Sequence, residues 1–389
     1  MKNIVLKIRE DVLSQGEAAL FAITKEVDKI ALESFIYKVP QNIKIDKNLA
    51  AAIKIAKKNI EKFHKAEYKK LYKNNKIETS PEIFCWKKFT PIQNVGLYVP
   101  NGLFSSLLMN VIPAQIAGCG KIIICTPPNP SQEILYVCRL LKINKIYTIG
   151  GAQAIFAMAY GVGEISKVDK IFGPGNEFVN EAKKLVSCEV AIDMPAGPSE
   201  VLIIGDENTK TYDAIYDLLA QLEHGKESRA WLFSSSETLI KNVQEKIMAE
   251  IKKFPRQEIL QKSINNLVCK KFNNIVEALN ESNKIAPEHL ILNIKDAENY
   301  LDLVKNAGSV FVGKYTTESL GDYLSGTNHV LPTSGFAKSF SGLSVLSFGK
   351  FITFQTTSKQ GLESVAAHVA TMAKAEGLNF HAESILSRL

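Results

Sequence analysis

Two pairs of polar residues in this sequence combine side chains that could bind a metal ion or transfer protons. The first pair is Gln221 and His224, three residues apart in DLLAQLEHG, which has a helical pattern. On a helix this spacing places both side chains on one face, where an amide and an imidazole could meet a single ion. A histidine near a helix end is also common as a capping or core residue, so the pair alone does not establish a metal site.

The second pair is Glu288 and His289, adjacent in APEHL. Pro287 disfavours helix for Ala286 and predicts an extended chain that leads into the pair. Neighbouring side chains on a strand point to opposite faces, so joint action requires a turn here. A carboxylate and an imidazole would supply the two bases that an alcohol-to-acid oxidation needs. A strand entry with the glutamate in solvent is the alternative.

Other candidate residues lie in loops and near the carboxyl terminus. Asp322 falls in SLGDYLSGTNHVLPT, whose composition predicts an irregular loop beyond a strand, where α/β proteins place functional residues. The segment DMPAGPSE (193–200) leaves room for a ligand beside Ser199, or forms a rigid connection between two α/β units. His381, with Glu376 five residues before it, lies so near the end that a role requires a docked tail.

Alternating β-rich and helical segments must position these residues. Strand-like runs occupy 95–99, 121–125, 145–149, 170–173, 201–205, 231–235, 266–270, 289–293 and 308–313, with helical patterns notably at 209–224, 236–253, 296–306 and 362–376. This alternation predicts an α/β protein whose parallel sheets are covered by helices on both faces. The amino-terminal part is expected to be helical, with interruptions at Gly16 and Pro40.

The composition is that of an ordinary globular protein, with 389 residues, 46% hydrophobic and 22% charged. No apolar run approaches the ~18 residues of a membrane span, and Lys2, Lys7 and Arg9 occupy the place of a signal peptide's apolar region. Six cysteines without a CxxC pair predict reduced thiols. We therefore expect a cytoplasmic protein that has no membrane partner.

Lysines dominate the positive charge, and the formal net charge is +7. Nine lysines lie between Lys54 and Lys76, and Ile53, Ala56 and Ile60 recur among them at helical spacing. This pattern predicts an amphipathic helix whose lysines face water. Because arginines and exposed aromatic residues are nearly absent from the stretch, we expect no nucleic-acid partner.

Two glycine-containing loops follow predicted strands, GGAQA (150–154) and GPGNE (173–177). Neither supplies the GxGxxG fingerprint of a dinucleotide-binding fold. Glycine after a strand is often only a turn residue. The spacing alone therefore leaves a nicotinamide cofactor undecided.

Nine segments, taken together and in order, resemble those of histidinol dehydrogenases from near residue 10 to the last residue. They are VGLYVP, GGAQAI, KVDKIFGPGN, AIDMPAGPSEVL, DLLAQLEHG, APEHL, AGSVFVG, GDYLSGTNHVLPT and AEGLNFH. The resemblance implies two incomplete Rossmann-like, doubly wound parallel-sheet units and a small carboxyl-terminal helical segment. It also implies oxidation of L-histidinol through L-histidinaldehyde to L-histidine with two NAD, the last step of histidine biosynthesis.

A zinc site also follows from the resemblance. One ion per subunit would be bound by Gln221, His224, Asp322 and His381. Nitrogen and oxygen ligands suit Zn²⁺, although ligand type alone leaves manganese and cobalt open. The substrate would contact the same four residues together with Ser199, His289 and Glu376.

Catalytic and cofactor residues are implied in the same way. His289 would take the alcohol proton in the first oxidation, and Glu288 would activate the water that hydrates the aldehyde before the second. The positions that correspond to dinucleotide contacts are Tyr98, Gln153 and Asn176. The two glycine loops thereby gain a role that their spacing alone did not indicate.

For the domains, we expect residues 1–97 and 201–343 to form a first, discontinuous α/β domain that carries most metal and catalytic residues. Residues 98–200 would form a second domain on the dinucleotide side. The resemblance implies a homodimer in which residues 344–389 cross to the partner subunit. His381 would then complete the neighbour's site.

Two departures from the family pattern bear on these expectations. The chain begins later than typical members, and the loop YVPNGLFSS is shortened, with Asn101 where a glycine is common. A dehydrogenase of another small alcohol and a metal-binding descendant without turnover remain as alternatives. The presence of both Glu288 and His289 argues against the second, because a scaffold needs no pair of bases beside a metal.

Overall fold

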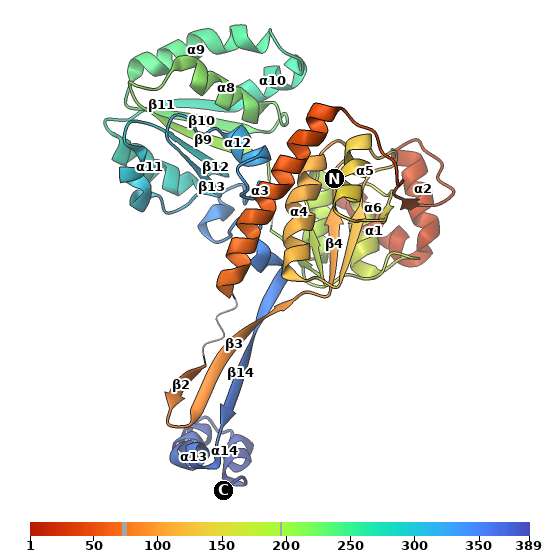
Figure 1. Ribbon diagram of the computed structural model, residues 1–389, viewed down its shortest axis with the longest axis vertical. Helices are drawn as coiled ribbons and strands as arrows, with labels where there is room; N and C mark the ends of the chain where they lie inside the picture. Colours follow the sequence, from red (N-terminus) through yellow and green to blue (C-terminus); the bar gives the residue numbers. More distant parts are fainter. Residues whose placement is uncertain (72–75, 195–196) are drawn as a thin grey trace.

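The computed structural model describes residues 1–389 except 72–75 and 195–196. These residues form two α/β units and a long arm that projects away from both (Figure 1). Each unit has its own sheet, and the arm is a three-stranded antiparallel sheet that ends in two helices. The expected α/β class with two mainly parallel sheets is confirmed.

The first unit is built around a sheet in the order β1-β6-β5-β4-β7-β8. Its strands are β1 (Ile36–Lys38), β4 (Asn94–Tyr98), β5 (Lys121–Cys125), β6 (Lys145–Tyr147), β7 (Lys170–Phe172) and β8 (Ala191–Ile192), and β1 alone is antiparallel to its neighbour among these described pairs. Its helices are α1 (Lys2–Gln15), α2 (Glu17–Val27), α3 (Lys47–Leu71), α4 (Phe104–Ala117), α5 (Gln132–Leu140), α6 (Gly151–Tyr160) and α7 (Glu177–Val186).

Helices cover both faces of this sheet. Side chains of α1, α2, α6 and α7 pack on one face, and those of α3, α4 and α5 pack on the other. Ile123 belongs to the first core and Ile124 to the second, because neighbouring side chains of a strand point to opposite faces. The short apolar runs read from the sequence are therefore strands buried on both sides.

The second unit has the all-parallel strand order β11-β10-β9-β12-β13. Its strands are β9 (Glu200–Gly205), β10 (Arg229–Ser234), β11 (Leu267–Lys271), β12 (His289–Asn293) and β13 (Ser309–Val312). Its helices are α8 (Thr211–Leu222), α9 (Glu237–Ile251), α10 (Gln257–Ser263), α11 (Ile275–Ile285) and α12 (Glu318–Tyr323), with 3-10 turns η1 (Ile264–Asn266) and η2 (Ala297–Leu303). Side chains of α8, α9 and α10 pack on one face, and those of α11 and η2 on the other.

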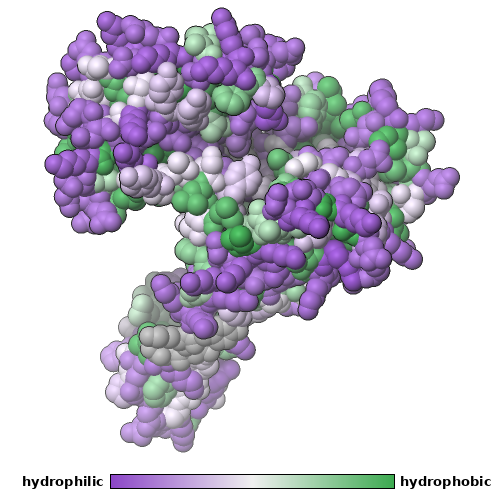
Figure 2. Space-filling model, turned by 45° about the horizontal axis from the view of Figure 1, so that its top comes forward, coloured by the Kyte–Doolittle hydropathy of each residue, from purple (hydrophilic) through white to green (hydrophobic). Residues whose placement is uncertain are grey.

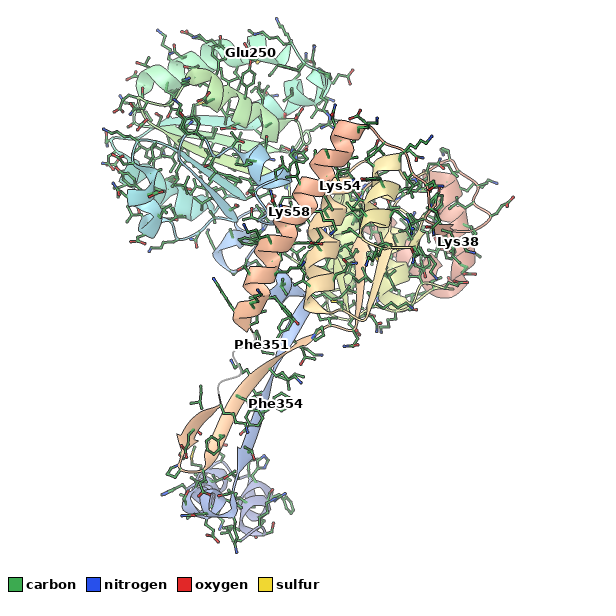
Figure 3. The ribbon with its side chains drawn as sticks, viewed as in Figure 1. Lys38, Lys54, Lys58, Glu250, Phe351 and Phe354 are labelled. Carbon is green, nitrogen blue, oxygen red and sulfur yellow. The ribbon has the colours of Figure 1, made fainter. Side chains whose placement is uncertain are left out.

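The arm joins segments that are distant in the sequence. Strand β3 (Ile83–Pro91) pairs with β2 (Ile77–Ser80) and with β14 (Gly349–Thr357), and Trp86 stacks on Phe354 with ring centroids 5.5 Å apart. Helices α13 (Lys359–Ala375) and α14 (Asn379–Leu386) form the tip, around a small core of Ala370, Ala373 and Ala382. Figure 3 shows Phe351 and Phe354 along this arm, and Figure 2 shows it projecting from the body.

The packing of the amino-terminal residues differs from the expected grouping of 1–97 with 201–343. Strand β1 pairs with β6, and the apolar faces of α1 and α3 pack on the first sheet, not the second. Strand β4 lies inside that sheet, and the turns η3 (Phe336–Lys338) and η4 (Val345–Phe348) lead into the arm. Helical periodicity shows which face of α1 or α3 is buried, but not which sheet covers it.

Helix α3 has the predicted amphipathic character. Ile53, Ala56 and Ile60 are buried, while Lys54 and Lys58 extend from the opposite side of the helix (Figure 3). Its lysines are solvated or paired with a glutamate of the same helix, which is typical of a surface helix. Of the helices that the structure describes, none is long and apolar enough to cross a membrane.

Candidate active site

A cavity of about 230 Å³ lies between the two α/β units. On the first unit it is lined by the loop that follows β7, Gly173 to Gly175, and by the start of α4. On the second unit it is lined by the amino ends of β9 and β12 and by α12. The candidate residues among its lining are Ser199, His224, Glu288, His289 and Asp322.

The chain turns sharply just before Glu288 and His289. Helix α11 ends at Ala286, whose φ of 55° lies in the left-handed region, and β12 begins at His289. Both side chains are buried, and His289 Nδ1 lies 3.8 Å from Glu288 Oε2. The turn that joint action would require is therefore present, and both residues reach the cavity.

His289 has one ring nitrogen engaged and the other free. Nδ1 lies 3.1 Å from the backbone oxygen of Glu200, which accepts the Nδ1 proton. Nε2 is buried and has no hydrogen-bond partner among the described residues. Burial lowers the pKa of His289 to about 3, so the imidazole is neutral near pH 7. The contact with Glu200 assigns the lone pair to Nε2.

Glu288 is held from the neighbouring strand. Its Oε2 accepts the backbone N–H of Glu200 at 2.9 Å. Burial raises the pKa of the Glu288 carboxyl well above its ordinary range, and the nearby Asp322 and Glu200 carboxylates add to this. An ionised Glu288 is therefore a stronger base than a carboxylate in water.

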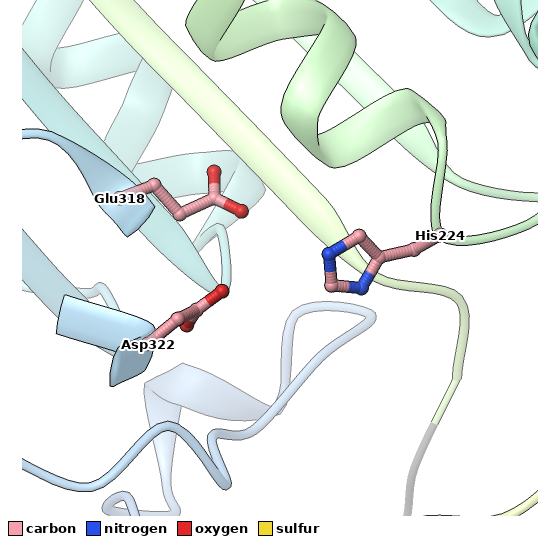
Figure 4. A group of neighbouring side chains, drawn as sticks. All are labelled: His224, Glu318 and Asp322. Atoms are coloured by element: carbon pink, nitrogen blue, oxygen red, sulfur yellow. The ribbon is translucent and has the colours of Figure 1, made fainter. Parts of the chain in front are cut away.

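His224, Glu318 and Asp322 form a compact group beside these bases. One potential ligand atom from each lies within 4.8 Å of the others, and the three side chains point toward one another (Figure 4). Glu318 and Asp322 are four residues apart on α12, so they share one face. Thr317 caps this helix by accepting the N–H of Leu320 at 3.2 Å. Asp322 thus lies on a short helix and not in the irregular loop that the sequence predicted.

The electrostatics of this group favour a cation. Burial raises the pKa of Asp322 to about 6 and that of the fully buried Glu318 well above its ordinary range. Within the described residues, no lysine or arginine forms an ion pair with either carboxylate or with Glu288. Buried carboxylates without a compensating charge are costly unless they are protonated or bind a metal.

Gln221 lies deeper, between this group and His289. One end of its amide lies 2.9 Å from Glu318 Oε1, 3.2 Å from the Glu200 backbone oxygen and 3.0 Å from His289 Nδ1. The Gln221 amide therefore contacts both the carboxylate group and the imidazole base. Helix α8 ends at Leu222, so His224 lies two residues beyond the helix on which the sequence placed it. Its backbone N–H donates to the Gln221 backbone oxygen at 3.2 Å, and this turn keeps the two residues close.

The residues expected to contact a dinucleotide lie at the carboxyl ends of strands in the first sheet. The hydroxyl of Tyr98 accepts the N–H of Gly151 at 3.1 Å, and Gln153 is buried on α6. Asn176 caps α7 by accepting the N–H groups of Phe178 and Val179, each at 3.1 Å. All three border the loops that follow β4, β6 and β7, and the last of these loops lines the cavity.

The expected residues near the carboxyl terminus are not at the cavity of their own chain. Glu376 and His381 are exposed at the tip of the arm, remote from the cavity (Figure 1).

Ser199 does line the cavity. Of the segment DMPAGPSE, Pro195 and Ala196 lie outside the described residues. In the shortened loop, Asn101 bonds to the backbone of Asn129 and Ser131.

Two residues at the site, Glu318 and His329, were not singled out by the sequence. Glu318 was missed because it directly precedes SLGDYLSGTNHVLPT, which was predicted to be a loop. A threonine cap followed by two carboxylates four apart was the available signal. His329 lines the cavity, donates from Nδ1 to the Asp322 backbone oxygen at 2.9 Å, and lies 3.3 Å from the Ser106 hydroxyl. No local pattern marks His329 as functional.

Comparison with known proteins identifies the family. A family model described as histidinol dehydrogenase matches residues 1–389. Histidinol dehydrogenase of Pasteurella multocida is 44% identical over 98% of this chain and 90% of its own length, and that of Haemophilus influenzae is 44% identical over 100% and 92%. The crystal structure of histidinol dehydrogenase from Elizabethkingia anophelis superposes with a TM-score of 0.95 at 41% identity, covering 99% of this chain and 91% of that one. The chain therefore belongs to the histidinol dehydrogenase family.

Proposed function

We propose that the cavity between the two units is the active site of an NAD-dependent histidinol dehydrogenase, in which a metal ion holds the substrate and Glu288 and His289 handle protons. The observation that carries this proposal is the buried Nε2 of a neutral His289, which has no hydrogen-bond partner among the described residues. It lies beside carboxylates that form no ion pair with a lysine or arginine of the described chain. Oxidation of an amino alcohol to an acid requires a deprotonated base that takes the hydroxyl proton, and a bound cation would hold the substrate beside that base.

The residues present fit a divalent metal. His224 and Asp322, with Gln221 deeper in the site, offer the nitrogen and oxygen ligands that zinc accepts. The buried Glu318 carboxylate would be a further ligand or would orient the Gln221 amide, with which it is in contact. When bound, zinc would fix the imidazole and amine of the substrate and partly neutralise the surrounding carboxylates.

The first oxidation needs a base for the hydroxyl proton of histidinol. His289 is neutral, and its Nε2 carries the free lone pair, so this atom accepts the proton as the alcohol carbon loses a hydride to NAD. The Glu200 backbone oxygen holds the Nδ1 proton and stabilises the imidazolium that forms. Ser199 lines the cavity and contributes to substrate binding.

The second oxidation needs water to add to the aldehyde. Ionised Glu288 takes a proton from that water, because its raised pKa makes it a strong base. The Glu200 N–H keeps one carboxylate oxygen fixed and leaves the other for water. Loss of a second hydride from the deprotonated hydrate then gives the carboxylic acid, so one histidinol, one water and two NAD yield histidine, two NADH and the protons that the bases have taken up.

The cofactor would approach from the first unit. Tyr98, Gln153 and Asn176 surround the carboxyl ends of β4, β6 and β7, the edge at which open α/β sheets bind ligands. The amino end of α7, which Asn176 caps, offers a partial positive charge to an anionic group. The loop Gly173 to Gly175 connects this edge to the cavity, where the nicotinamide would meet the substrate.

The arm would complete the site of a second copy. Phe380 is 90% exposed and Met372 is 67% exposed at the tip, which supports burial of this surface by another subunit. Glu376 and His381 of the partner subunit would then supply a substrate contact and a metal ligand. We accordingly propose a homodimer, and six free cysteines support a reducing, cytoplasmic location.

The activity is tested by NADH formation from L-histidinol and NAD, before and after chelation and after zinc is restored. Two NADH per histidinol, lost on chelation and recovered with zinc, is the expected result. A folded, zinc-loaded protein that forms no NADH would refute the proposed function. Turnover of another alcohol in its place would identify a different substrate.

Shared sites are tested by mixing two inactive variants, His289→Asn and His381→Asn, after joint unfolding and refolding. If sites are completed in trans, each mixed dimer keeps one intact site, so random pairing restores about one quarter of the parent activity. If each site uses His289 and His381 of one chain, the mixture stays inactive. Each variant refolded alone is the control.

A further inference from the structure

We propose that the buried ion pair of Lys183 and Asp193 is a positioning device that fixes the cofactor-side wall of the cavity. Neither residue belongs to the catalytic or metal-binding groups described above, yet both line the same cavity. The proposal rests on the proposed function, because it assigns the loop that the pair holds to binding of the dinucleotide.

The pair is buried, and each side chain makes further hydrogen bonds. The side chains of Lys183 on α7 and Asp193 after β8 are only 3% and 1% exposed, and their charged groups are in direct contact. Asp193 Oδ1 also accepts the N–H of Met194 at 2.8 Å. Burial of two charges is expensive, and a hydrophobic pair of similar volume is often as stable, so stability alone does not account for this arrangement.

Both charges bind the same peptide unit, that of Gly173. Lys183 Nζ donates to the Gly173 backbone oxygen at 3.0 Å, and Asp193 Oδ2 accepts the Gly173 N–H at 2.9 Å. The pair therefore holds the first residue of the loop from both polar groups of its backbone. Because charge-assisted hydrogen bonds are roughly twice as strong as neutral ones, this attachment restricts the loop strongly.

Gly173 needs such an attachment because its conformation is unusual. Its φ is 113°, and a Cβ at this position would lie 2.0 Å from the backbone oxygen of Tyr98. Only glycine fits so close to the end of β4, and glycine has the greatest freedom to leave the conformation. The ion pair compensates for that freedom.

The loop forms the cavity wall with its backbone. Gly173, Pro174 and Gly175 line the cavity, and a Cβ on Gly175 would lie 2.3 Å from Val179 of α7. A wall of backbone atoms can approach a flat ring or a phosphate more closely than side chains allow. We infer that Lys183 and Asp193 set the position at which the nicotinamide dinucleotide is held, and so act on NAD and not on histidinol.

The test compares Lys183→Met and the double variant Lys183→Met, Asp193→Leu with the parent enzyme. The single variant leaves a buried carboxylate unpaired and is expected to lower the melting temperature, whereas the double variant restores an uncharged interior. The single variant removes the hydrogen bond to the Gly173 backbone oxygen, and the double variant removes both hydrogen bonds to Gly173. The expected result for both is a KM for NAD raised on the order of tenfold to a hundredfold, since displacement by about 1 Å can cost on the order of 100-fold. The KM for histidinol should stay within about twofold.

A purely structural role predicts another pattern. A stable double variant with the KM for NAD of the parent would overturn the proposal, as would an equal rise in the KM for histidinol. Asp193→Asn keeps the shape of the side chain and serves if the other variants do not fold; a parent-like KM for NAD would again overturn the proposal. Lys184→Met is the matched control, because Lys184 is the next residue on α7 after Lys183 and is exposed.

Equilibrium binding of NADH, followed by fluorescence without substrate, separates this proposal from the proposed function. Weaker NADH binding by the double variant supports the positioning role even if the parent does not oxidise histidinol. Unchanged NADH binding overturns it even if the parent is fully active. Lys184→Met should bind NADH as the parent does.

Discussion

Asp217→Asn should stabilise the metal-free protein at alkaline pH. Asp217 lies on α8, one turn before Gln221, and is partly buried. Burial raises its pKa from 3.8 to about 7, and Asp213 on the same helix adds to the rise. The folded protein therefore disfavours the charged form of Asp217.

The sign and size of the effect follow from that shift. Well below pH 3.8 Asp217 is protonated in both the folded and the unfolded chain, and its ionisation has no effect on stability. As the pH rises from 4 to 7, Asp217 loses its proton in the unfolded chain but keeps it in the folded chain. The unfolded chain is thereby favoured, and the free energy of unfolding falls. A rise from 3.8 to about 7 corresponds to a loss of about 4 kcal/mol above pH 7. Asparagine has the same shape and does not suffer this loss.

The assay is denaturant unfolding of the metal-free parent and variant at pH 4 and pH 8. The variant should be more stable at pH 8 by up to about 4 kcal/mol and nearly equal at pH 4. Asp302→Asn removes an exposed carboxylate and should change stability by less than about 0.5 kcal/mol at either pH. Equal stability of parent and Asp217→Asn at pH 8 would refute the inference that burial of the ionised Asp217 carboxylate destabilises the folded protein. Added zinc should reduce the gain, because a nearby cation stabilises the charged form.

Three further substitutions address the site. His289→Asn should lower kcat/KM by about 10²- to 10⁴-fold through loss of the base, while the zinc content measured by metal analysis stays at the parent value. Glu288→Gln should impair the second oxidation more than the first, so the NADH formed per histidinol falls from two toward one and a carbonyl trap captures aldehyde. Glu318→Gln should weaken zinc binding by about 10- to 100-fold in a chelator competition, and raise the melting temperature of the metal-free protein; unchanged zinc affinity would remove Glu318 from the metal group.

The sequence predicts the strands of both units well because their signal is local. Runs such as KIIIC and VLIIG are buried on both faces, so a continuous apolar run between turn residues is enough to predict them. The arm could not be predicted in this way. Its strands β3 and β14 lie far apart in the sequence, and each is partly exposed, so neither has a continuous apolar pattern.

The candidate site residues also differ in whether a local sequence signal or a contact between distant segments brings them together. Glu288 and His289 are adjacent, and a proline before them indicates the break in the helix, so their approach is encoded locally. Glu318 comes close to His224 only because α12 packs beside α8, a contact between segments that the sequence does not link. The expected role of His381 depends on a second chain, and it stays a prediction until the mixing experiment is done.

The cavity requires each unit to keep its place relative to the other, since the bases lie on one and the glycine loop on the other. Three contacts fix this relation immediately after α12. Asn59 of α3 donates to the Leu324 backbone oxygen at 2.8 Å, and Asn328 donates to the Met109 backbone oxygen of α4 at 2.6 Å. Gly326 lies so close to α3 that a Cβ would be 2.8 Å from the Asn59 backbone oxygen. The segment that follows Asp322 is thus fastened to the first unit, which couples the position of the candidate metal group to that of the loop expected to hold the cofactor.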